Sequence, residues 1–481
     1  MSRTTVADVV ADGLRRAGAR RVFGVPGGGA RSALLDAARD AGLPLVLAYG
    51  ETAACVMAAV TGDLAEAPAA DFICAGPGVA AAAAGLAHAV LDRSPMLLLT
   101  DRHPGDVLGC KASLAVEAAS AGHGIAHAAR LAMAEPRGPV HLDVPPDVAT
   151  QSAVTVAASC RPDPLAPPDA RALDEAARLI AGAARPLLAL GLHCRAVDAP
   201  WLRALAEALP APVLTTCRGK GAVPDPHPLV LGVVTGEAPE EPLVRTADLI
   251  VAIGLDPVEP VPASWWAGLP VLALGPAPPA GSGLAPAFEV TGGIAAILEE
   301  LAPRLAGRAR ADWDVAALDR AKRAGPSRRT AGAGFPRHRA VRIAREATEA
   351  GTLATADAGA CLDVVAAAWD AVAPREFLAS NARAATGFAL PAAIAAHLVH
   401  PGRRIVCFTD PAGLTAASSE LETAHRLRAP VVVVVFGGAE PVRLAQGFGL
   451  PAFAADSEAS FAQALGRALG RPGPALIAVV G

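Results

Sequence analysis

Short uninterrupted apolar runs recur along the chain, and amphipathic stretches separate them. Runs such as 96–100 (MLLLT) and 431–436 (VVVVVF) have the length of a strand. Strands buried on both faces of a parallel sheet read in this continuous way. Between the runs, segments such as 6–17 place their apolar residues at helical spacing. Strands alternating with helices predict doubly wound, mostly parallel sheets, an α/β fold.

The pattern divides into three segments, so we predict three α/β domains covering residues 1–155, 169–303 and 337–481. A proline-rich stretch at 162–168 and an Arg-, Ala- and Gly-rich stretch at 304–336 separate them. The predicted strands are 21–25, 44–48, 70–75, 96–100 and 139–144, then 186–190, 212–215, 249–253 and 271–274, then 352–355, 404–408, 431–436 and 475–480. The predicted helices include 30–40, 52–66, 79–92, 338–349, 390–399, 415–427 and 458–469.

Composition and charge narrow the function classes. Of the 481 residues, 53% are hydrophobic and 18% charged, which indicates a folded chain with a large core. Forty-two basic against 46 acidic residues give a net charge of -4, so there is no basic surface expected for nucleic acid. The longest apolar runs are too short to span a bilayer, and the N-terminus lacks a signal-peptide pattern. Eight cysteines without a CxxC pair favour reduced thiols, so we expect a cytoplasmic protein that contacts no membrane.

Several motifs occur in an order that resembles the thiamine diphosphate (ThDP) enzymes of the acetolactate synthase and 2-oxoacid decarboxylase type. They include VFGVPGGG at 22–29, GETAACVMA at 50–58, Gly-Pro-Gly at 76–78, TGFALPAAIAAH at 386–397 and ELETAHRLRAPVVVVV at 420–435. Each is weak by itself, but their collinearity over nearly the whole chain is specific. The resemblance implies a pyrimidine-binding-like first domain, a central domain and a diphosphate-binding-like third domain, with the first and third alike in topology.

The resemblance assigns a catalytic role to Glu51. In the family, a glutamate hydrogen-bonds the aminopyrimidine ring and helps the thiazolium carbon lose its proton, and the resulting ylid attacks a 2-oxo acid. A carboxylate at a strand-to-helix junction can be held where its proton affinity is tuned. Alternatively, Glu51 is only an acidic residue that favours the helix dipole. The expected cofactor-binding residues are Pro26, Gly27, Gly76, Pro77, Gly78, Thr386, Gly387, Asp410, Gly413, Gly437 and Gly438.

The sequence departs from the family where the diphosphate and its Mg²⁺ are held. The family uses a Gly-Asp-Gly turn and an Asn-Asn pair, whose oxygens suit a hard divalent ion. An ungapped register puts Pro411 at the aspartate position, whereas a one-residue gap makes Asp410 the metal ligand. In either register, Gly437 and Gly438 replace the asparagines. At least one side-chain ligand is therefore missing.

Other segments of the family pattern are shortened too. The region between residues 100 and 138 lacks the family's Phe-Gln-Glu segment, the lid after Gly438 is reduced, and Thr386 replaces a bulky residue. Burying a diphosphate without a cation costs several kcal/mol per charge, while a helix N-terminus supplies roughly half a charge. The N-terminus of the helix predicted near residue 415, with Arg383 and Arg443, offers a metal-free alternative.

Two functional hypotheses follow. The first is an acetolactate synthase-like enzyme that makes or breaks the C–C bond next to the carbonyl of a small 2-oxo acid, with ThDP and magnesium as cofactors and FAD not excluded. The second is a family member that has lost ThDP and metal, and serves as a binding or regulatory protein or uses the pocket for other chemistry. In the family the cofactor lies between two subunits, so a homodimer or homotetramer is expected.

Overall fold

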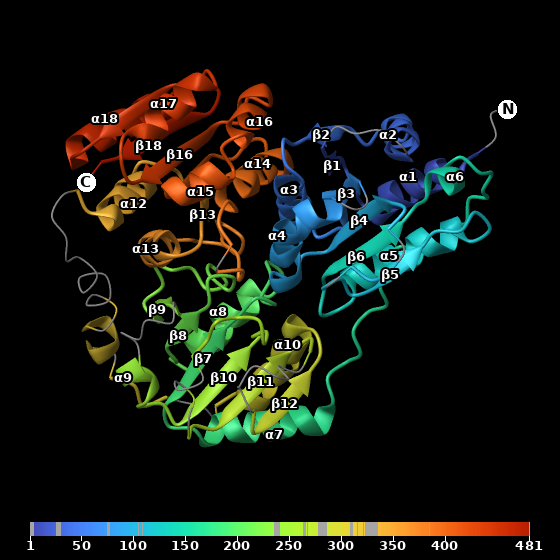
Figure 1. Ribbon diagram of the computed structural model, residues 1–481. Coiled ribbons are helices and arrows are strands. Elements are labelled where there is room, and N and C mark those ends of the chain that lie inside the picture. Colours follow the sequence, from blue (N-terminus) through green and yellow to red (C-terminus); the bar gives the residue numbers. More distant parts are fainter. Residues whose placement is uncertain are drawn as a thin grey trace.

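The chain folds into three six-stranded parallel sheets with helices packed against them, as the computed structural model in Figure 1 shows. The N-terminal and C-terminal domains lie side by side, and the central domain lies across from both. The doubly wound α/β fold predicted from the sequence is confirmed. The structure describes residues 4–25, 30–74, 77–103, 105–107, 109–234, 241–262, 266, 268–277, 286–307, 311–314, 316–320, 322, 335–383 and 385–480.

The N-terminal domain has the strand order β2-β1-β3-β4-β6-β5. Its strands are β1 (Val22–Gly24), β2 (Leu45–Leu47), β3 (Ala69–Cys74), β4 (Met96–Asp101), β5 (Ser113–Ala115) and β6 (Pro139–Asp143). Its helices are α1 (Val6–Ala17), α2 (Ala30–Asp40), α3 (Glu51–Ala65), α4 (Pro77–Leu91), α5 (Ala121–Met133) and α6 (Pro146–Ala149).

The central domain has the order β12-β11-β10-β7-β8-β9. Its strands are β7 (Pro186–Leu190), β8 (Val213–Thr215), β9 (Val230–Val233), β10 (Leu249–Ile253), β11 (Val271–Gly275) and β12 (Phe288–Thr291). Its helices are α7 (Ala170–Gly182), α8 (Ala199–Ala208), α9 (Glu241–Val244) and α10 (Ile294–Leu305). The chain order within this sheet reverses between β7 and β10, which makes that point the crevice of a doubly wound fold.

The C-terminal domain has the order β14-β13-β15-β16-β18-β17. Its strands are β13 (Leu353–Ala356), β14 (Phe377–Leu378), β15 (Ile405–Thr409), β16 (Val431–Phe436), β17 (Ala452–Ala455) and β18 (Ala475–Val479). Its helices are α12 (Arg337–Glu346), α13 (Ala360–Ala368), α14 (Ala389–Val399), α15 (Pro411–Ala416), α16 (Glu420–Arg426), α17 (Glu440–Gly447) and α18 (Glu458–Leu469).

The N-terminal and C-terminal sheets have the same topology. Replacing β1 to β6 by β13 to β18 converts one strand order into the other, and all pairings in both sheets are parallel. The predicted similarity of the first and third domains is therefore confirmed. In each sheet the order in which successive strands are added reverses at the same point, between β1 and β3 or between β13 and β15. Ligands of such folds bind outside the carboxyl ends of the strands at this point.

The N-terminal and C-terminal domains share one apolar core. Residues of α3, such as Val56 and Met57, belong to the same buried cluster as Ala393 and Ile394 of α14. Small residues dominate both helices, so the two backbones can approach closely and bury a continuous surface. The two sheets are thereby held in a fixed relation within one chain. Within the described part of the chain, every helix is too short or too polar to cross a bilayer.

Five strands were not predicted, and each lies at the edge of its sheet. They are β5, β9, β12, β14 and β17. Edge strands need not be apolar on both faces, and β12 (FEVT), for example, keeps alternate residues exposed. The helix predicted over 415–427 is wrong in detail, because α15 begins at Pro411 and a break separates it from α16. Asp410 caps α15 and Pro411 suits its first turn, so the helix begins earlier than predicted.

Candidate functional site

Glu51 is the first residue of α3, directly after the turn that follows β2. Gly50 is the N-cap and has an extended backbone without a side-chain cap. The Glu51 side chain is half-buried, and the residues that follow on α3 are packed in the core shared by the two domains. A helix N-terminus favours a negative charge, whereas apolar surroundings favour the neutral acid. Glu51 thus occupies the strand-to-helix junction that the sequence predicts.

Glu420 of the C-terminal domain holds the loop before Glu51. Its Oε1 accepts hydrogen bonds from the backbone N–H of Tyr49 at 2.9 Å and of Gly50 at 3.3 Å. Glu420 is 1% exposed, and burial raises the pKa of its carboxyl above the ordinary value, against hydrogen bonds from Thr423, Tyr49 and Gly50 that lower it. The backbone position of the predicted catalytic acid therefore depends on a side chain 370 residues away in sequence.

At the carboxyl edge of the C-terminal sheet, Asp357 follows β13 and is 1% exposed. Its Oδ1 accepts from the backbone N–H groups of Gly387, Phe388 and Ala389 at 3.1, 2.8 and 3.0 Å. Its Oδ2 accepts from the Thr409 hydroxyl at 2.5 Å. Burial raises the pKa of Asp357, against these hydrogen bonds. The chain's own carboxylate thus occupies the N-terminus of α14, where a helix can bind an anion.

Asp410 follows β15, and its carboxylate serves its own helix. Asp410 is the N-cap of α15, and its Oδ1 accepts from the Gly413 N–H at 2.9 Å. The backbone N–H that we expected to face a phosphate is therefore already bonded. Gly413 is buried, and a Cβ there would collide with Asp357 Oδ2 and the Thr409 hydroxyl. Close packing against Asp357 explains why glycine occupies this position.

The remaining positions of the predicted diphosphate edge lie beside Asp410. Gly437 and Gly438 follow β16 with φ values of +137° and +66°, and a Cβ on Gly437 would be 3.3 Å from the Pro411 ring. Gly387 has a φ of +90° and is buried before α14, while Thr386 is exposed. The structure thus brings Asp410, Pro411 and the two glycines together, as the collinear motifs predict.

The predicted loops of the N-terminal domain are only partly described. Pro26, Gly27 and Gly76 lie outside the described residues. Pro77 and Gly78 are the first two residues of α4, so this helix begins two residues before the helix predicted over 79–92. Proline at the first helical position is pre-organised for the helix, which accounts for the earlier start.

The residues present at the diphosphate edge do not fit a magnesium ion held in the family manner. Among the described residues, no group of three or more His, Cys, Asp or Glu is placed to hold a metal. Asp410 is half-buried and bonded to its own helix, and Pro411, Gly437 and Gly438 carry no side-chain oxygen. Octahedral Mg²⁺ requires hard oxygen ligands. We therefore assign no step of the chemistry to a metal ion.

The two arginines considered as a metal-free source of positive charge are not equivalent. Arg383 is about one-quarter exposed and its Nη2 lies 2.7 Å from Asp363 Oδ1, so its charge is already paired. Arg443 lies on α17 and is exposed. Neither arrangement supplies a buried, uncompensated cation at the edge described above.

The crevice of the central domain is filled by a carboxylate. Glu259 is 6% exposed, and its Oε2 accepts from the backbone N–H groups of Leu192 and Asp256, each at 3.0 Å. Gly191, directly after β7, has no room for a Cβ because Glu259 and the Gly254 loop are in the way. A dinucleotide phosphate placed at this point would find the N–H groups of Leu192 and Asp256 already bonded to Glu259.

Three of these residues were missed by sequence reasoning as parts of the site: Asp357, Thr409 and Glu420. Asp357 directly follows an apolar strand-length run, and that position at a strand's carboxyl end is a signal that could have found it. Thr409 ends the next such run. Glu420 begins the motif at 420–435, but the motif does not indicate its partners, which are backbone groups of a distant loop.

Three family models match the chain in the order of the three domains. They describe the thiamine pyrophosphate enzyme N-terminal TPP binding domain (residues 4–127), central domain (173–301) and C-terminal TPP binding domain (357–439). The chain belongs to the thiamine pyrophosphate enzyme family. Thiamine pyrophosphate is the same compound as ThDP, so the family identified from the motifs is confirmed.

Relatives within this family match along most of their length. The catabolic acetolactate synthase of Raoultella terrigena is 28% identical over 98% of this chain and 94% of that protein. The acetolactate synthase isozyme 1 large subunit of Escherichia coli is 25% identical over 99% and 94%. A Pseudomonas aeruginosa protein named as a probable 2-ketoarginine decarboxylase is 28% identical over 87% and 79%. The chain is therefore acetolactate synthase-like.

A solved structure from Mycobacterium smegmatis, described as that of a thiamin diphosphate-dependent enzyme, has the same fold. It superposes with a TM-score of 0.84 at 22% identity and covers 100% of this chain and 99% of that chain. At this identity the likeness concerns the fold alone. The shortened segments after β4 and β16 therefore leave the three-domain architecture intact.

Proposed function

We propose that this protein is a ThDP-binding enzyme that makes or breaks the C–C bond next to the carbonyl of a 2-oxo acid. Glu51 carries the proposal: it begins α3 after a turn held by Glu420, and it matches the family's catalytic glutamate. The names of the relatives, acetolactate synthases and a 2-oxo acid decarboxylase, support the substrate class. When bound, ThDP supplies the electron sink for bond cleavage beside a carbonyl.

In this proposal the protein itself supplies one acid–base group, Glu51, which would hold a proton beside the cofactor. The Glu51 carboxyl group would hydrogen-bond a ring nitrogen of the bound cofactor, donating as the protonated acid and accepting as the carboxylate. Such positioned acid–base groups typically contribute 10²- to 10⁴-fold in rate. Glu420 fixes the backbone before Glu51 from the C-terminal domain. Asp357 fixes the N-terminus of α14, and through Thr409 it fixes the end of β15.

The decisive experiment is turnover of pyruvate and larger 2-oxo acids by the purified full-length chain with added ThDP. We expect Glu51→Gln to lower kcat by about 10²- to 10⁴-fold, because glutamine cannot exchange the proton. A matched control is Glu299→Gln, an exposed residue of α10 in the central domain, which should keep the wild-type rate. An unchanged rate in Glu51→Gln would remove Glu51 from the mechanism.

A second candidate is a family member without ThDP or metal that acts as a binding or regulatory protein. The specific observation that favours it is the diphosphate edge, where Asp410 is bonded to its own helix and Gly437 and Gly438 offer no ligand. In that case no 2-oxo acid is turned over and ThDP leaves the melting temperature unchanged. A ligand that binds the folded state must raise it, so the two candidates give opposite results.

We also infer a homodimer or homotetramer in the cytoplasm. The resemblance places the cofactor between the first domain of one subunit and the third domain of another. Seven described cysteines, among them Cys55, Cys194 and Cys407, are free thiols, and burial raises the pKa of Cys194 and Cys407. Inert, protonated thiols suit a reducing compartment. Sedimentation velocity of the chain with and without ThDP tests the assembly, and a monomer in both would contradict it.

A further inference from the structure

A cavity lined by arginines lies where the three domains meet, away from Glu51 and Asp410. Its volume is about 200 Å³, and its wall includes Arg137, Arg195, Arg375 and Arg403. The arginines come from loops of all three domains: the α5–β6 loop, the loop after β7, and the loops before β14 and β15. The carboxyl edge of the central sheet faces this junction, and ligands of doubly wound folds bind at such edges.

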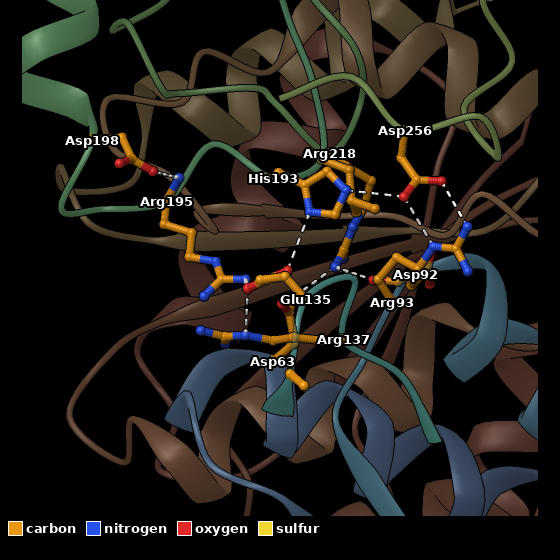
Figure 2. Close-up of polar contacts among 12 residues, drawn as sticks. Asp63, Asp92, Arg93, Glu135, Arg137, His193, Arg195, Asp198, Arg218 and Asp256 are labelled. Atoms are coloured by element: carbon orange, nitrogen blue, oxygen red, sulfur yellow. Dashed lines mark hydrogen bonds and ion pairs between the residues drawn. The ribbon is translucent and has the colours of Figure 1, made fainter. Parts of the chain in front are cut away.

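The acids at this junction are shared between arginines. Figure 2 shows Arg137 and Arg195 both directed at Glu135, with the Arg137 Nε–Glu135 Oε1 distance 3.1 Å. Asp63 is shared in the same way. Its Oδ2 lies 2.7 Å from Arg218 Nη2 (Figure 2), and its Oδ1 lies 3.1 Å from Arg375 Nη2.

On the cavity wall itself, four guanidiniums face two carboxylates, Asp63 and Glu66. Glu66 is half exposed, and its Oε2 is 3.6 Å from Arg137, so it neutralises little of that charge. Arg403 has Glu376 as its own partner at 3.1 Å. With Glu135, Glu376 and the guanidinium of Arg218 included, five guanidiniums are set against four carboxylates. The junction therefore keeps one positive charge in excess, and a buried cation without a partner is costly unless an anion joins it.

Arg375 is the most strained member. It is a non-glycine residue with a φ of +64°, a conformation that costs on the order of 1–3 kcal/mol and tends to persist at functional sites. Burial lowers the pKa of Arg375, Asp63 raises it, and the neighbouring Arg218 and Arg195 lower it again. The strained backbone thus holds a cation among other cations.

We propose that this cavity binds a small phosphate-bearing dianion. Planar guanidiniums bind phosphate oxygens in pairs, and arginines from different loops can surround a tetrahedral anion. The volume is below the usual 300–1,000 Å³ of sites for drug-sized ligands, so a nucleotide is too large and inorganic phosphate or a three-carbon phosphate ester is the right size. An anion bound here links all three domains.

The test is calorimetric titration of the full-length chain with inorganic phosphate and, separately, with glycerol 3-phosphate, in a buffer without other polyanions and with saturating ThDP. We expect saturable binding of phosphate. Tighter binding of the ester identifies a phosphate ester as the preferred ligand, and equal binding identifies free phosphate. No saturable binding of either overturns the proposal.

Three variants locate the site. Arg195→Met removes a guanidinium that is 18% exposed and should weaken binding at least about tenfold. Glu66→Gln removes a rim carboxylate, and we expect it to tighten binding about two- to threefold, a result that loss of folding cannot imitate. Arg39→Met removes an exposed arginine of the ion pair with Asp36 and should have no effect. Equal affinity in the wild type, Arg195→Met and Glu66→Gln would place the anion elsewhere and overturn the proposal.

Discussion

The N-terminal and C-terminal sheets have the same topology, but their carboxyl edges carry different side chains. At the N-terminal edge, Glu51 still stands at the start of α3 with its loop fixed by Glu420. At the C-terminal edge, Asp357 has its own hydrogen-bond network, whereas the positions expected to hold a cation carry proline and glycine. The comparison teaches that two sheets of the same topology can carry an acid at one edge and no side-chain oxygen at the corresponding positions of the other, because the packing of each edge is satisfied locally.

The largest expected effect comes from removing Asp357. In Asp357→Ala, three backbone N–H groups at the start of α14 and the Thr409 hydroxyl lose their buried acceptor. Hydrogen bonds to charged groups contribute about 1.5–3 kcal/mol each, so we expect the free energy of unfolding to fall by about 3 kcal/mol or more. Urea denaturation measures it.

Asp410→Ala is the matched control for this change, since Asp410 only caps α15 through Gly413. Its loss should cost about 1 kcal/mol. Equal losses in the Asp357 and Asp410 variants would mean that the two carboxylates do not differ in structural role, and the contrast drawn within this edge would fail.

The next largest loss of stability is expected from a substitution at Gly413, which is closely packed. Gly413→Ala places a methyl group against Asp357 and Thr409, so we expect a loss of about 2 kcal/mol through overpacking. Gly466→Ala on α18, where a Cβ meets open space, should instead gain about 0.5–1 kcal/mol from helix propensity. Thermal unfolding of the pair checks the prediction, and a stabilised Gly413→Ala would show that the edge is loosely packed.

Glu420 links the two edges. In Glu420→Ala the N–H groups of Tyr49 and Gly50 lose their acceptor, so we expect a loss of about 1–2 kcal/mol and a lower kcat through a looser Glu51 loop. Glu420→Gln keeps an acceptor oxygen and should retain the loop and most of the rate.

The pH dependence of the free energy of unfolding provides a second test of the role of Glu420. Because the folded-state pKa of Glu420 is raised, its stabilising contribution is complete below the ordinary glutamate pKa, about 4.3, and is lost as the pH rises through the raised value. Glu420→Gln should therefore flatten the stability curve above about pH 4.3. Denaturation at several pH values tests this, and an identical curve in the wild type and the variant would contradict it.

The smallest effect is expected from a variant that introduces a metal ligand at the diphosphate edge. Pro411→Asp places a carboxylate beside Gly437, at the family's aspartate position in the ungapped register, and aspartate suits the first turn of α15. We expect Mg²⁺ to strengthen ThDP binding by about tenfold in this variant and not in the wild type. Calorimetry of both proteins decides, with Pro411→Ala as the control for loss of the ring.

The sequence predicts the inner part of this fold well and its rim poorly. Strands such as 249–253 and 431–436 are buried on both faces and show as apolar runs, so they were found with the right bounds. Edge strands such as β5 and β14 have two or three residues and mixed polarity, and their pairing depends on neighbours that the local pattern does not contain. The start of α15 at Pro411 differs from the predicted start at residue 415, although an Asp-Pro pair is a typical signal for a helix start.

At the site, too, some features follow from the sequence pattern and others depend on how the domains pack. Glu51 and the glycine positions follow from collinear motifs, which record chain order. The Glu420 contact with the Glu51 loop joins residues 371 apart in sequence, and the arginine cavity takes its wall from all three domains. No periodicity or spacing along the chain carries that information, since it arises only when the three domains pack.

We propose that Glu51 supplies the acid of a ThDP site whose diphosphate edge no longer provides side-chain oxygens for Mg²⁺. Titration of the purified chain with ThDP in excess EDTA and again in Mg²⁺ tests it most directly. We predict ThDP binding with the same Kd, within about twofold, in both conditions. A Kd that tightens tenfold or more with Mg²⁺ would contradict the claim, and the absence of binding in both would contradict the proposed enzyme.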